Sequence, residues 1–319
     1  MAFKVVITDY EYHDLLIEEE VFSNSGLEID FVKAQCKTAE EVLEVCKDAD
    51  GIINQYAPIN AAVLSNLEQC KVISRYGVGV DTIHLPTARD KGIIVANVPD
   101  YGIEEVSNHT VALLLAWSRK IVQLNEAVKR GHWDFKLAIP IYRFNQKVFG
   151  VLGFGKIPRR VIEKVSTFGF QLVGYDPFVS AEEMAKYNVK KLDLDEIIQQ
   201  ADILSIHVPL NENTHHLINE DSIAKMKDGV FIINTARGPI IKESALIEGI
   251  KSGKIAGAAL DVTEIEPLPS SSELMKFPNV YITPHSAFYS EEAIVELRTK
   301  TAMNIVQVLE GKSVEYLVE

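Results

Sequence analysis

The sequence predicts an α/β fold with two doubly wound parallel sheets, one in each of two domains. Short apolar runs alternate with longer helical patterns along the whole chain, which is typical of parallel sheets covered by helices. The composition, with 47% apolar and 24% charged residues, is that of a globular protein and disfavours disordered or collagen-like segments. The 319 residues leave room for two ordinary domains.

The runs that we interpret as strands fall into two series. The first series comprises Val5–Thr8, Ile29–Val32, Gly51–Ile53, Val72–Ser74 and Ile93–Ala96. The second series comprises Val148–Gly153, Gln171–Tyr175, Ile203–His207, Val230–Asn234, Gly257–Asp261 and Val280–Thr283. Helical or turn segments separate the runs, so each series predicts one open sheet.

Two long helices are expected where the chain passes between the series. The first, Ile103–Lys120, has an apolar stripe, glutamates at its start and basic residues at its end, an order that suits the helix dipole. The second, Glu291–Leu309, precedes a glycine that can stop a helix, and we expect it to return to the first sheet. The first domain would then be discontinuous, with residues 1–100 and 286–319, and the second domain would be residues 101–285.

Charge and cysteine content restrict the classes of partner. The formal net charge of −13 disfavours nucleic acid and membrane surfaces, whereas a few local arginines still permit a small anionic substrate. The three cysteines, Cys36, Cys46 and Cys70, lack the spacing of a disulfide framework or a zinc site, so we expect no metal and a reducing cytoplasm. The N-terminal apolar run is too short for a signal peptide, and no run is long enough to cross a membrane.

A glycine loop follows the first strand of the second series. The segment Gly153–Pro158 lies between that strand and a helical pattern at Arg159–Thr167, and a helix N-terminus there can bind a pyrophosphate. An ordinary strand-to-helix turn is the alternative interpretation. Asp176, 23 positions after Gly153, ends the next strand where a carboxylate can accept hydrogen bonds from a ribose. Because no basic residue follows Asp176 before position 181, NAD is favoured over NADP.

Proline stands in the loop where a dinucleotide fingerprint usually has its third glycine. Pro158 is tolerated in the first turn of a helix, but it is expected to bias Ile157 away from helical angles. We therefore hypothesise that the turn is slightly displaced and that phosphate contacts are weaker than usual.

Three polar residues follow strands of the second series, where loops at the carboxyl ends converge on one crevice. Arg237 offers a planar two-pronged donor for a carboxylate, and His285 backed by Glu266 offers a proton donor near neutral pH. Together they suit a 2-oxo acid. Each has a structural alternative: Arg237 could cap a turn, Glu266 could be a solvated loop acid, and His285 could be structural.

Several motifs together resemble a known family. They are Arg75–Asp81 (RYGVGVD), Asn97–Pro99, the glycine loop, His207–Leu210 with Thr214, Asn234–Gly238 and Thr283–His285. In this order they are similar to the D-isomer-specific 2-hydroxyacid dehydrogenases, over nearly the whole chain. The resemblance implies a flavodoxin-like substrate domain formed by both termini, an inserted Rossmann nicotinamide domain, and a homodimer built on the latter.

The resemblance also implies NAD-dependent reduction of a 2-oxo acid to a D-2-hydroxy acid, and the reverse reaction. Its catalytic residues would be Arg237, which binds the substrate carboxylate and carbonyl, Glu266, and His285 as acid and base. Substrate would be bound by Val78, Gly79, Tyr76, Tyr101, Arg237 and His285. The cofactor would be bound by Gly153, Phe154, Gly155, Lys156, Ile157, Asp176, His207, Pro209, Thr214, Thr235, Ala236, Arg237, Asp261 and His285.

Two details bear on the substrate, and two further resemblances disagree with each other. Residues 54–58 (NQYAP) have no arginine where phosphoglycerate-using relatives often carry one, and Tyr76, Tyr101, Phe288 and Tyr289 could form an apolar pocket wall or pack the hinge. The SAFY stretch is similar to D-lactate dehydrogenases, whereas residues 98–116 resemble the carboxy-terminal-binding proteins. An NAD(H)-sensing scaffold or transcriptional co-regulator is therefore the alternative to an enzyme.

Overall fold

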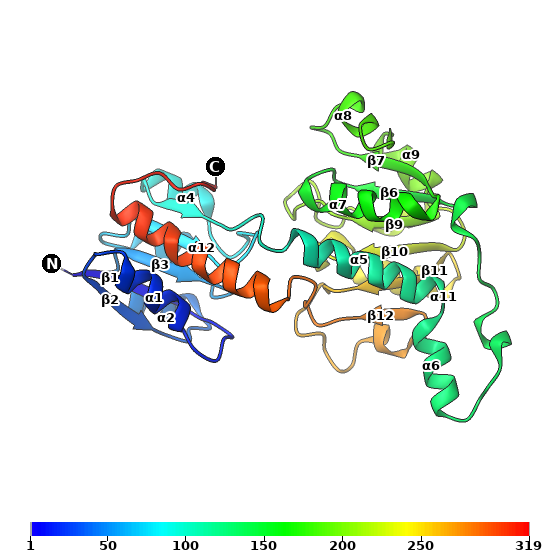
Figure 1. The fold of residues 1–319 in the computed structure, drawn as a ribbon, viewed down its shortest axis with the longest axis horizontal. Coiled ribbons are helices and arrows are strands. Elements are labelled where there is room, and N and C mark those ends of the chain that lie inside the picture. Colours follow the sequence, from blue (N-terminus) through cyan, green and yellow to red (C-terminus); the bar gives the residue numbers. More distant parts are fainter. Residues whose placement is uncertain (1, 319) are drawn as a thin grey trace. The chain divides into compact units, whose positions relative to one another are not determined.

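The computed structural model describes residues 2–318, and the chain divides into two compact units (Figure 1). The first unit combines Met1–Gly102 with Ser290–Glu319, and the second is Ile103–Tyr289. These junctions lie two residues beyond the expected boundary at 100 and four beyond that at 285. Each unit has a parallel sheet covered by helices, which confirms the predicted fold class.

The first unit contains a five-stranded sheet in the order β2-β1-β3-β4-β5, with every pairing parallel. This is the flavodoxin-like order. Its strands are β1 (Phe3–Ile7), β2 (Ile29–Lys33), β3 (Gly51–Asn54), β4 (Val72–Arg75) and β5 (Ile94–Ala96). Apolar residues on both faces are buried, as expected for strands covered by helices on both sides.

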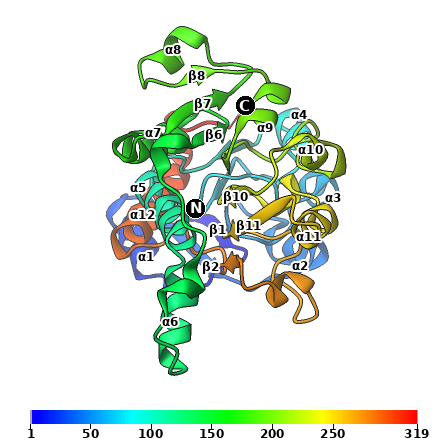
Figure 2. The ribbon, with the colours of Figure 1, turned by 90° about the vertical axis from the view of Figure 1, so that its right-hand side faces the viewer.

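Helices cover both faces of this sheet (Figures 1 and 2). One face carries α1 (Leu16–Asn24) and α12 (Glu291–Leu309), and the other carries α2 (Ala39–Cys46), α3 (Ala61–Ser65) and α4 (Leu85–Asp90). Helix α12 has the predicted bounds and packs against β3 and β4, so the end of the chain completes the first unit.

A buried ion pair joins α12 to α1. The guanidinium of Arg298 donates from Nε to Glu18 Oε1 over 2.8 Å and from Nη2 to Glu18 Oε2 over 2.7 Å. The hydroxyl of Tyr76 donates to the same Oε1 over 2.7 Å. Burial alone would lower the pKa of Arg298, but hydrogen bonding and charge from Glu18 outweigh it, so the pKa is raised. The two-pronged geometry is that of a strong, directional pair.

The second unit contains a seven-stranded parallel sheet in the order β12-β11-β10-β9-β6-β7-β8. This is the Rossmann order, with its switch point between β6 and β9. The strands are β6 (Val148–Leu152), β7 (Gln171–Tyr175), β8 (Lys190–Lys191), β9 (Ile203–Ile206), β10 (Val230–Asn234), β11 (Ile255–Leu260) and β12 (Val280–Ile282). Ligands bind outside the carboxyl ends of such strands, at the switch point.

Helices again lie on both faces of the sheet (Figure 2). One face carries α5 (Ile103–Ser118) and α7 (Lys156–Val165), which pack together, and the other carries α9 (Leu194–Gln200), α10 (Glu220–Lys225) and α11 (Glu243–Lys251). The short helix α8 (Ala181–Ala185) lies beside β8 at the edge.

The structure differs from the sequence prediction in three places. Helix α5 ends at Ser118, because Lys120 has a left-handed backbone (φ 57°), and a further helix α6 (Ile121–Lys129) follows. Strand β8 was not predicted, because it has only two residues, both lysines, at a sheet edge. Helix α7 begins at Lys156 and includes Ile157, so the expected bias of Ile157 away from helical angles was wrong. Pro158 lies in the first turn, where a missing N–H is tolerated.

Beyond α6 the chain forms two short 3-10 helices, η1 (Phe135–Ala138) and η2 (Phe144–Gln146), before it enters β6. Within residues 2–318, none of the helices combines the length and the apolar composition that crossing a bilayer requires.

Candidate active site

The candidate residues of the second unit lie at the carboxyl ends of its parallel strands. Gly153 follows β6, Asp176 follows β7, and His207 follows β9. Arg237, Asp261 and His285 lie in the loops after β10, β11 and β12. The topology therefore brings residues that are distant in sequence to one edge of one sheet, as predicted.

The glycine loop is packed against the loop after β9 at the switch point. Gly153 has φ 92°, and a side-chain carbon placed on it would lie 2.8 Å from the carbonyl oxygen of His207. Only glycine accommodates both this backbone conformation and this approach. Gly155 has no such need, since a carbon placed on it would meet no atom within 4 Å among the residues described. The space in front of Gly155 is where a ligand can approach the backbone.

This space lies at the N-terminus of α7, where the helix dipole is positive. Gly155 is the N-cap, and no side chain among the described residues caps this helix. The side chain of Arg159 donates to the carbonyl oxygen of Phe154 over 3.0 Å and pairs with Glu183, which fixes the loop from the protein side. An open, positive helix end preceded by a fixed glycine loop fits the pyrophosphate of a dinucleotide.

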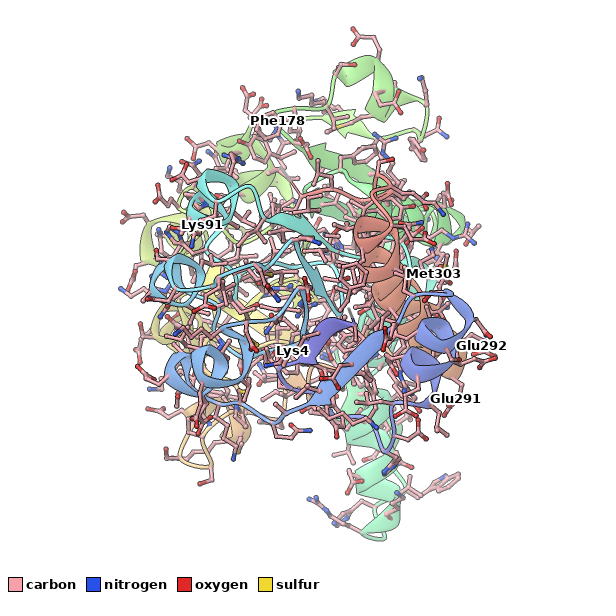
Figure 3. All side chains as sticks on the ribbon, turned by 90° about the vertical axis from the view of Figure 1, so that its left-hand side faces the viewer. Lys4, Lys91, Phe178, Glu291, Glu292 and Met303 are labelled. Atoms are coloured by element: carbon pink, nitrogen blue, oxygen red, sulfur yellow. The ribbon has the colours of Figure 1, made fainter. Side chains whose placement is uncertain are left out.

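Asp176 is tied to the glycine loop. Its Oδ2 accepts the backbone N–H of Phe154 over 2.8 Å, and its Oδ1 accepts that of Phe178 over 2.9 Å. The ring of Phe154 is buried, and its backbone N–H holds this carboxylate. The ring of Phe178 is 94% exposed and projects from the surface (Figure 3). The carboxylate of Asp176 and the glycine loop are thus joined in one element.

The loop that carries Arg237 is held by a buried asparagine. Asn234 accepts the N–H of Ala236 over 3.0 Å and donates to the carbonyl oxygen of Arg237 over 2.9 Å. A side-chain carbon placed on Gly238 would lie 1.8 Å from the carbonyl oxygen of Thr263, so this loop packs directly on the loop that carries Glu266. Sequence reasoning missed both Asn234 and Gly238 as supports of Arg237, although both belong to the motif Asn234–Gly238.

His285 and Glu266 form the predicted pair. Nδ1 of His285 lies 2.8 Å from Oε2 of Glu266, and the backbone N–H of Thr263 donates to Oε1 over 3.0 Å. A carboxylate can only accept, so Nδ1 carries the proton and Nε2 is directed away from Glu266.

The charge of Glu266 is stabilised by its surroundings. Burial works to raise its pKa, but the hydrogen bond and charge of His285 act in the opposite direction. The N–H of Thr263 and the positive charge of Arg237 add to that effect, and the pKa of Glu266 falls below its ordinary value. Arg237, Glu266 and His285 thus share one electrostatic environment.

Asp261 is a buried anchor for the turn that carries His285. Its Oδ1 accepts the N–H of Ser286 over 2.9 Å and its Oδ2 accepts that of Ala287 over 2.9 Å. The hydroxyl of Thr283 donates to Oδ1 over 2.6 Å. His285 itself has φ 49°, a left-handed backbone that is uncommon for a residue with a side chain and that persists only when the surroundings impose it.

The remaining expected cofactor residues differ in their surroundings. Nε2 of His207 forms a hydrogen bond with the hydroxyl of Ser205 over 2.8 Å. Burial lowers the pKa of His207 to about 3, so the ring is neutral. The hydroxyl of Thr235 pairs with that of Thr110 over 2.9 Å. The hydroxyl of Thr214 closes its own loop by donating to the carbonyl oxygen of Pro209 over 2.6 Å.

The expected substrate residues of the first unit are Val78, Gly79, Tyr76 and Tyr101. Val78 is exposed, and its carbonyl oxygen accepts from the side chain of Asn97 over 2.7 Å. Gly79 is half-buried. Tyr76 and Tyr101 are buried, and the hydroxyl of Tyr76 is committed to Glu18, so packing within the unit already accounts for Tyr76.

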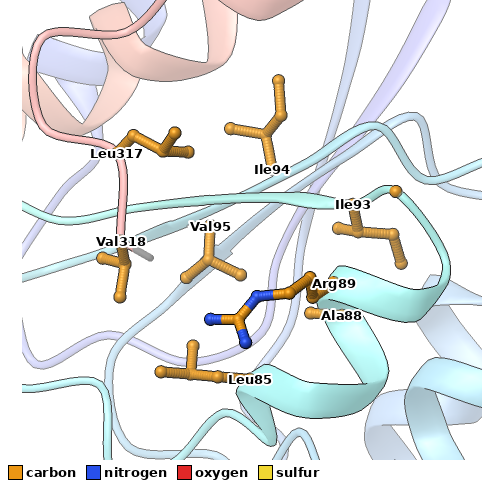
Figure 4. Close-up of a pocket in the computed structure, with 9 residues that line it drawn as sticks. Leu85, Ala88, Arg89, Ile93, Ile94, Val95, Leu317 and Val318 are labelled. Carbon is orange, nitrogen blue, oxygen red and sulfur yellow. The ribbon is translucent and has the colours of Figure 1, made fainter.

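The structure also contains a cavity that none of the predicted site residues lines. It has a volume of about 530 Å³ and lies in the first unit between α4, β5 and residues 317–318 (Figure 4). Its walls are mostly apolar, with the guanidinium of Arg89 directed across it (Figure 4). Across residues 2–318, no cluster of three or more His, Cys, Asp or Glu side chains could hold a metal ion.

Comparison with known proteins decides the family. Residues 111–287 match the NAD binding domain of D-isomer specific 2-hydroxyacid dehydrogenases. The chain belongs to this family. The match covers the glycine loop, Asp176 and all three candidate catalytic residues, and it supports NAD as the cofactor of this Rossmann unit.

Individual relatives agree with the family. The chain is 39% identical to the D-3-phosphoglycerate dehydrogenase of Methanocaldococcus jannaschii, with 99% of this chain and 59% of that protein covered. It is 41% identical to an aromatic 2-oxoacid reductase of Clostridium sporogenes, with 83% of this chain and 84% of that protein covered. The chain thus spans little more than half the length of the phosphoglycerate relative.

A solved structure supports the fold of the chain. The D-lactate dehydrogenase of Aquifex aeolicus, determined with NAD and lactic acid, is 29% identical and superposes with a TM-score of 0.89. The alignment covers 98% of each chain. A family member that binds NAD therefore has the same fold throughout.

Proposed function

We propose that this chain is an NAD-dependent D-2-hydroxyacid dehydrogenase, which reduces a 2-oxo acid to the D-2-hydroxy acid and catalyses the reverse reaction. The observation that carries the proposal is the hydrogen bond between His285 and Glu266, from two loops at the carboxyl edge of the same sheet as the glycine loop, with the Glu266 loop packed against the Arg237 loop. Family membership supports the same activity.

Arg237 binds the substrate in this proposal. Its guanidinium matches a planar carboxylate, and its position is fixed by Asn234 and Gly238 below it. One positive charge then serves both the carboxylate in the ground state and the carbonyl oxygen as negative charge develops. The backbone at Val78 and Gly79 and the aromatic Tyr101 are proposed to complete substrate binding from the first unit.

His285 moves the proton. Its Nδ1 is bound to Glu266, so Nε2 gives a proton to the carbonyl oxygen during reduction and removes it from the hydroxyl during oxidation. Glu266 fixes the orientation of the imidazole, so that Nε2 is the nitrogen that faces the substrate oxygen in this proposal. Bound NADH supplies the hydride for the carbonyl carbon. The pyrophosphate and ribose are proposed to be held by Gly153, Gly155, Lys156, Ile157 and Asp176. The rest of the cofactor is proposed to lie beside His207, Pro209, Thr214, Thr235, Ala236 and Asp261.

The test is NADH oxidation with a panel of 2-oxo acids that have small, aromatic or phosphorylated side chains. We expect turnover with unphosphorylated acids, since residues 54–58 provide no arginine for a phosphate. NADH binding without turnover of any acid would contradict the proposal and leave the NAD(H)-sensing scaffold. Preferential turnover of the phosphorylated acid would refute the assignment of substrate class alone.

We also propose a homodimer built on the second unit. Helix α6 has no buried residue and extends away from the sheet of its unit (Figure 2). The segment after it exposes Trp133 by 88%, Phe135 by 75%, Ile139 by 66% and Tyr142 by 65%. An apolar segment of this kind is usually covered by another protein surface, and a second copy is the occupant implied by the family resemblance. Trp133→Asp should give a monomer by light scattering, whereas a monomeric wild-type chain would contradict the proposal.

A cytoplasmic location is proposed from the cysteines. Cys36, Cys46 and Cys70 are all free thiols, and two of them are buried in the first unit. Persistence of unpaired thiols suits a reducing compartment. Fractionation that found the protein in an oxidising compartment would contradict this assignment.

A further inference from the structure

We propose that His109 is a positioning residue for His285, acting through Thr283 and Asp261. His109 was not among the residues that the sequence singled out. This inference rests on the proposed function, because it assigns a role to the turn that carries the acid and base.

The connection begins on α5 and ends at the turn after β12. Nε2 of His109 lies 2.9 Å from the hydroxyl oxygen of Thr283, although the two residues are 174 positions apart. The same nitrogen lies 3.6 Å from Oδ1 of Asp261, whose side chain is 1% exposed. Thr283, in turn, lies 2.6 Å from that carboxylate oxygen. Three polar groups, from α5 and from the loops after β11 and β12, therefore meet at the buried carboxylate of Asp261.

The number of available hydrogens determines which group donates in each of these hydrogen bonds. The carboxylate of Asp261 accepts, so the single hydroxyl hydrogen of Thr283 is donated to it. The oxygen of Thr283 must then accept from His109, and Nε2 of His109 carries a proton. Helix α5 thus supplies a donor to a hydroxyl that has no second hydrogen to give.

Donation from His109 to Thr283 matters because the carboxylate of Asp261, to which Thr283 is bonded, also holds the backbone around His285. Asp261 accepts the N–H groups of Ser286 and Ala287 with its side chain, and its carbonyl oxygen accepts the N–H of His285 over 2.8 Å. These three bonds impose the left-handed conformation at His285. Losing the donor on α5 frees the Thr283 hydroxyl to rotate and weakens one side of that anchor.

The neighbouring residue on α5 holds the other catalytic loop in the same way. The hydroxyl of Thr110 donates to the carbonyl oxygen of Val106 over 2.8 Å, so at 2.9 Å from Thr235 it accepts. Thr235 lies two residues before Arg237. Consecutive residues of one helix therefore supply a donor to the His285 turn and an acceptor to the Arg237 loop, which fixes both loops relative to one rigid element.

The experiment compares two substitutions of His109 in the full chain. His109→Phe preserves ring volume and removes the donor, whereas His109→Gln keeps an N–H near the position of Nε2. For His109→Phe we expect kcat to fall by about tenfold to a hundredfold, the size of effect that a displacement of about 1 Å can produce. The KM for the 2-oxo acid and the Kd for NADH should stay within about threefold, and His109→Gln should restore kcat to within about threefold of wild type.

A second pair of variants covers a His109→Phe protein that fails to fold. Thr283→Val removes the hydroxyl and Thr283→Ser keeps it, so only the valine variant should lose kcat. Where both substitutions are tolerated, the double variant His109→Phe/Thr283→Val should be no slower than the slower single variant, because both break one chain.

The outcomes separate this inference from the proposed function. Wild-type turnover with unchanged kcat in His109→Phe, or in Thr283→Val, overturns the inference and leaves the proposed function intact. A loss in His109→Phe that His109→Gln does not rescue also overturns it, since packing rather than donation is then responsible. A wild-type chain that turns over no 2-oxo acid overturns both.

Discussion

Each unit contains a glutamate paired with a basic side chain, and the two pairs differ in burial. In the first unit the side chains of Glu18 and Arg298 are 0% and 8% exposed. In the second unit those of Glu266 and His285 are 39% and 31% exposed. The first pair joins two helices of one layer, whereas the second joins two loops at the edge of a sheet.

The difference lies in which atoms remain for a ligand. Glu18 accepts from Arg298 with both oxygens and also from Tyr76, so burial leaves no unsatisfied charge. The ring of His285 makes one hydrogen bond, to Glu266, and no other among residues 2–318. A fully satisfied buried pair stabilises a fold, while a half-exposed pair with one nitrogen directed outward can exchange a proton.

The largest effect is expected at the exposed pair. His285→Ala should lower kcat by about a hundredfold to ten-thousandfold, the usual contribution of a general acid and base. The midpoint of thermal unfolding should change little, because the side chain is partly exposed and buries little area. Steady-state NADH oxidation and calorimetry measure the two quantities. Near-normal turnover would remove His285 from the mechanism.

The buried pair should give the opposite result. Arg298→Met should lower the free energy of unfolding by about 3 to 5 kcal/mol, because it leaves the charge of Glu18 buried without its cationic partner. Urea unfolding followed by circular dichroism measures this loss. The double variant Glu18→Leu/Arg298→Met, which removes both charges, is the matched control and should recover part of it. A loss below about 1 kcal/mol would show that the pair is not effectively buried.

The two glycines of the glycine loop also differ in their surroundings: Gly153 is closely packed and Gly155 faces open space. Gly153→Ala should lower the free energy of unfolding by about 1 to 3 kcal/mol, because of its positive φ and the close carbonyl oxygen of His207. Gly155→Ala should leave stability within about 0.5 kcal/mol but weaken NADH binding, since its side chain enters open space. Urea unfolding and NADH fluorescence titration separate these outcomes. Equal stability losses at both positions would contradict the contrast.

The smallest effect is the pH dependence of stability at Glu266. Its pKa in the folded chain is below the ordinary value of about 4.3, so its charge contributes stability above that pH. The contribution is lost as pH falls through the folded pKa. Glu266→Gln does not titrate, and the difference in unfolding midpoint between wild type and variant should shrink from pH 6 towards pH 3. A constant difference would show that Glu266 has the same pKa in both states.

Sequence reasoning succeeded where a local pattern coincides with a tertiary contact. The strands after which Gly153, Asp176 and Arg237 occur were predicted because each contains a short run of buried apolar residues. Sequence reasoning failed for elements that bury few or no apolar residues, because such elements have no hydrophobic periodicity. Helix α6 has no buried residue, and β8 is a pair of lysines, so neither has apolar periodicity.

The sequence by itself determined that polar residues follow successive strands. Because parallel strands end at one edge of a sheet, the convergence of these residues follows from the strand pattern. Only the tertiary structure decided how those residues are held: the left-handed backbone of His285, the anchoring by Asp261 and the support from His109. The physical reason is distance along the chain. The bond between His109 and Thr283 spans 174 positions, and such contacts depend on packing of whole elements rather than on any local preference.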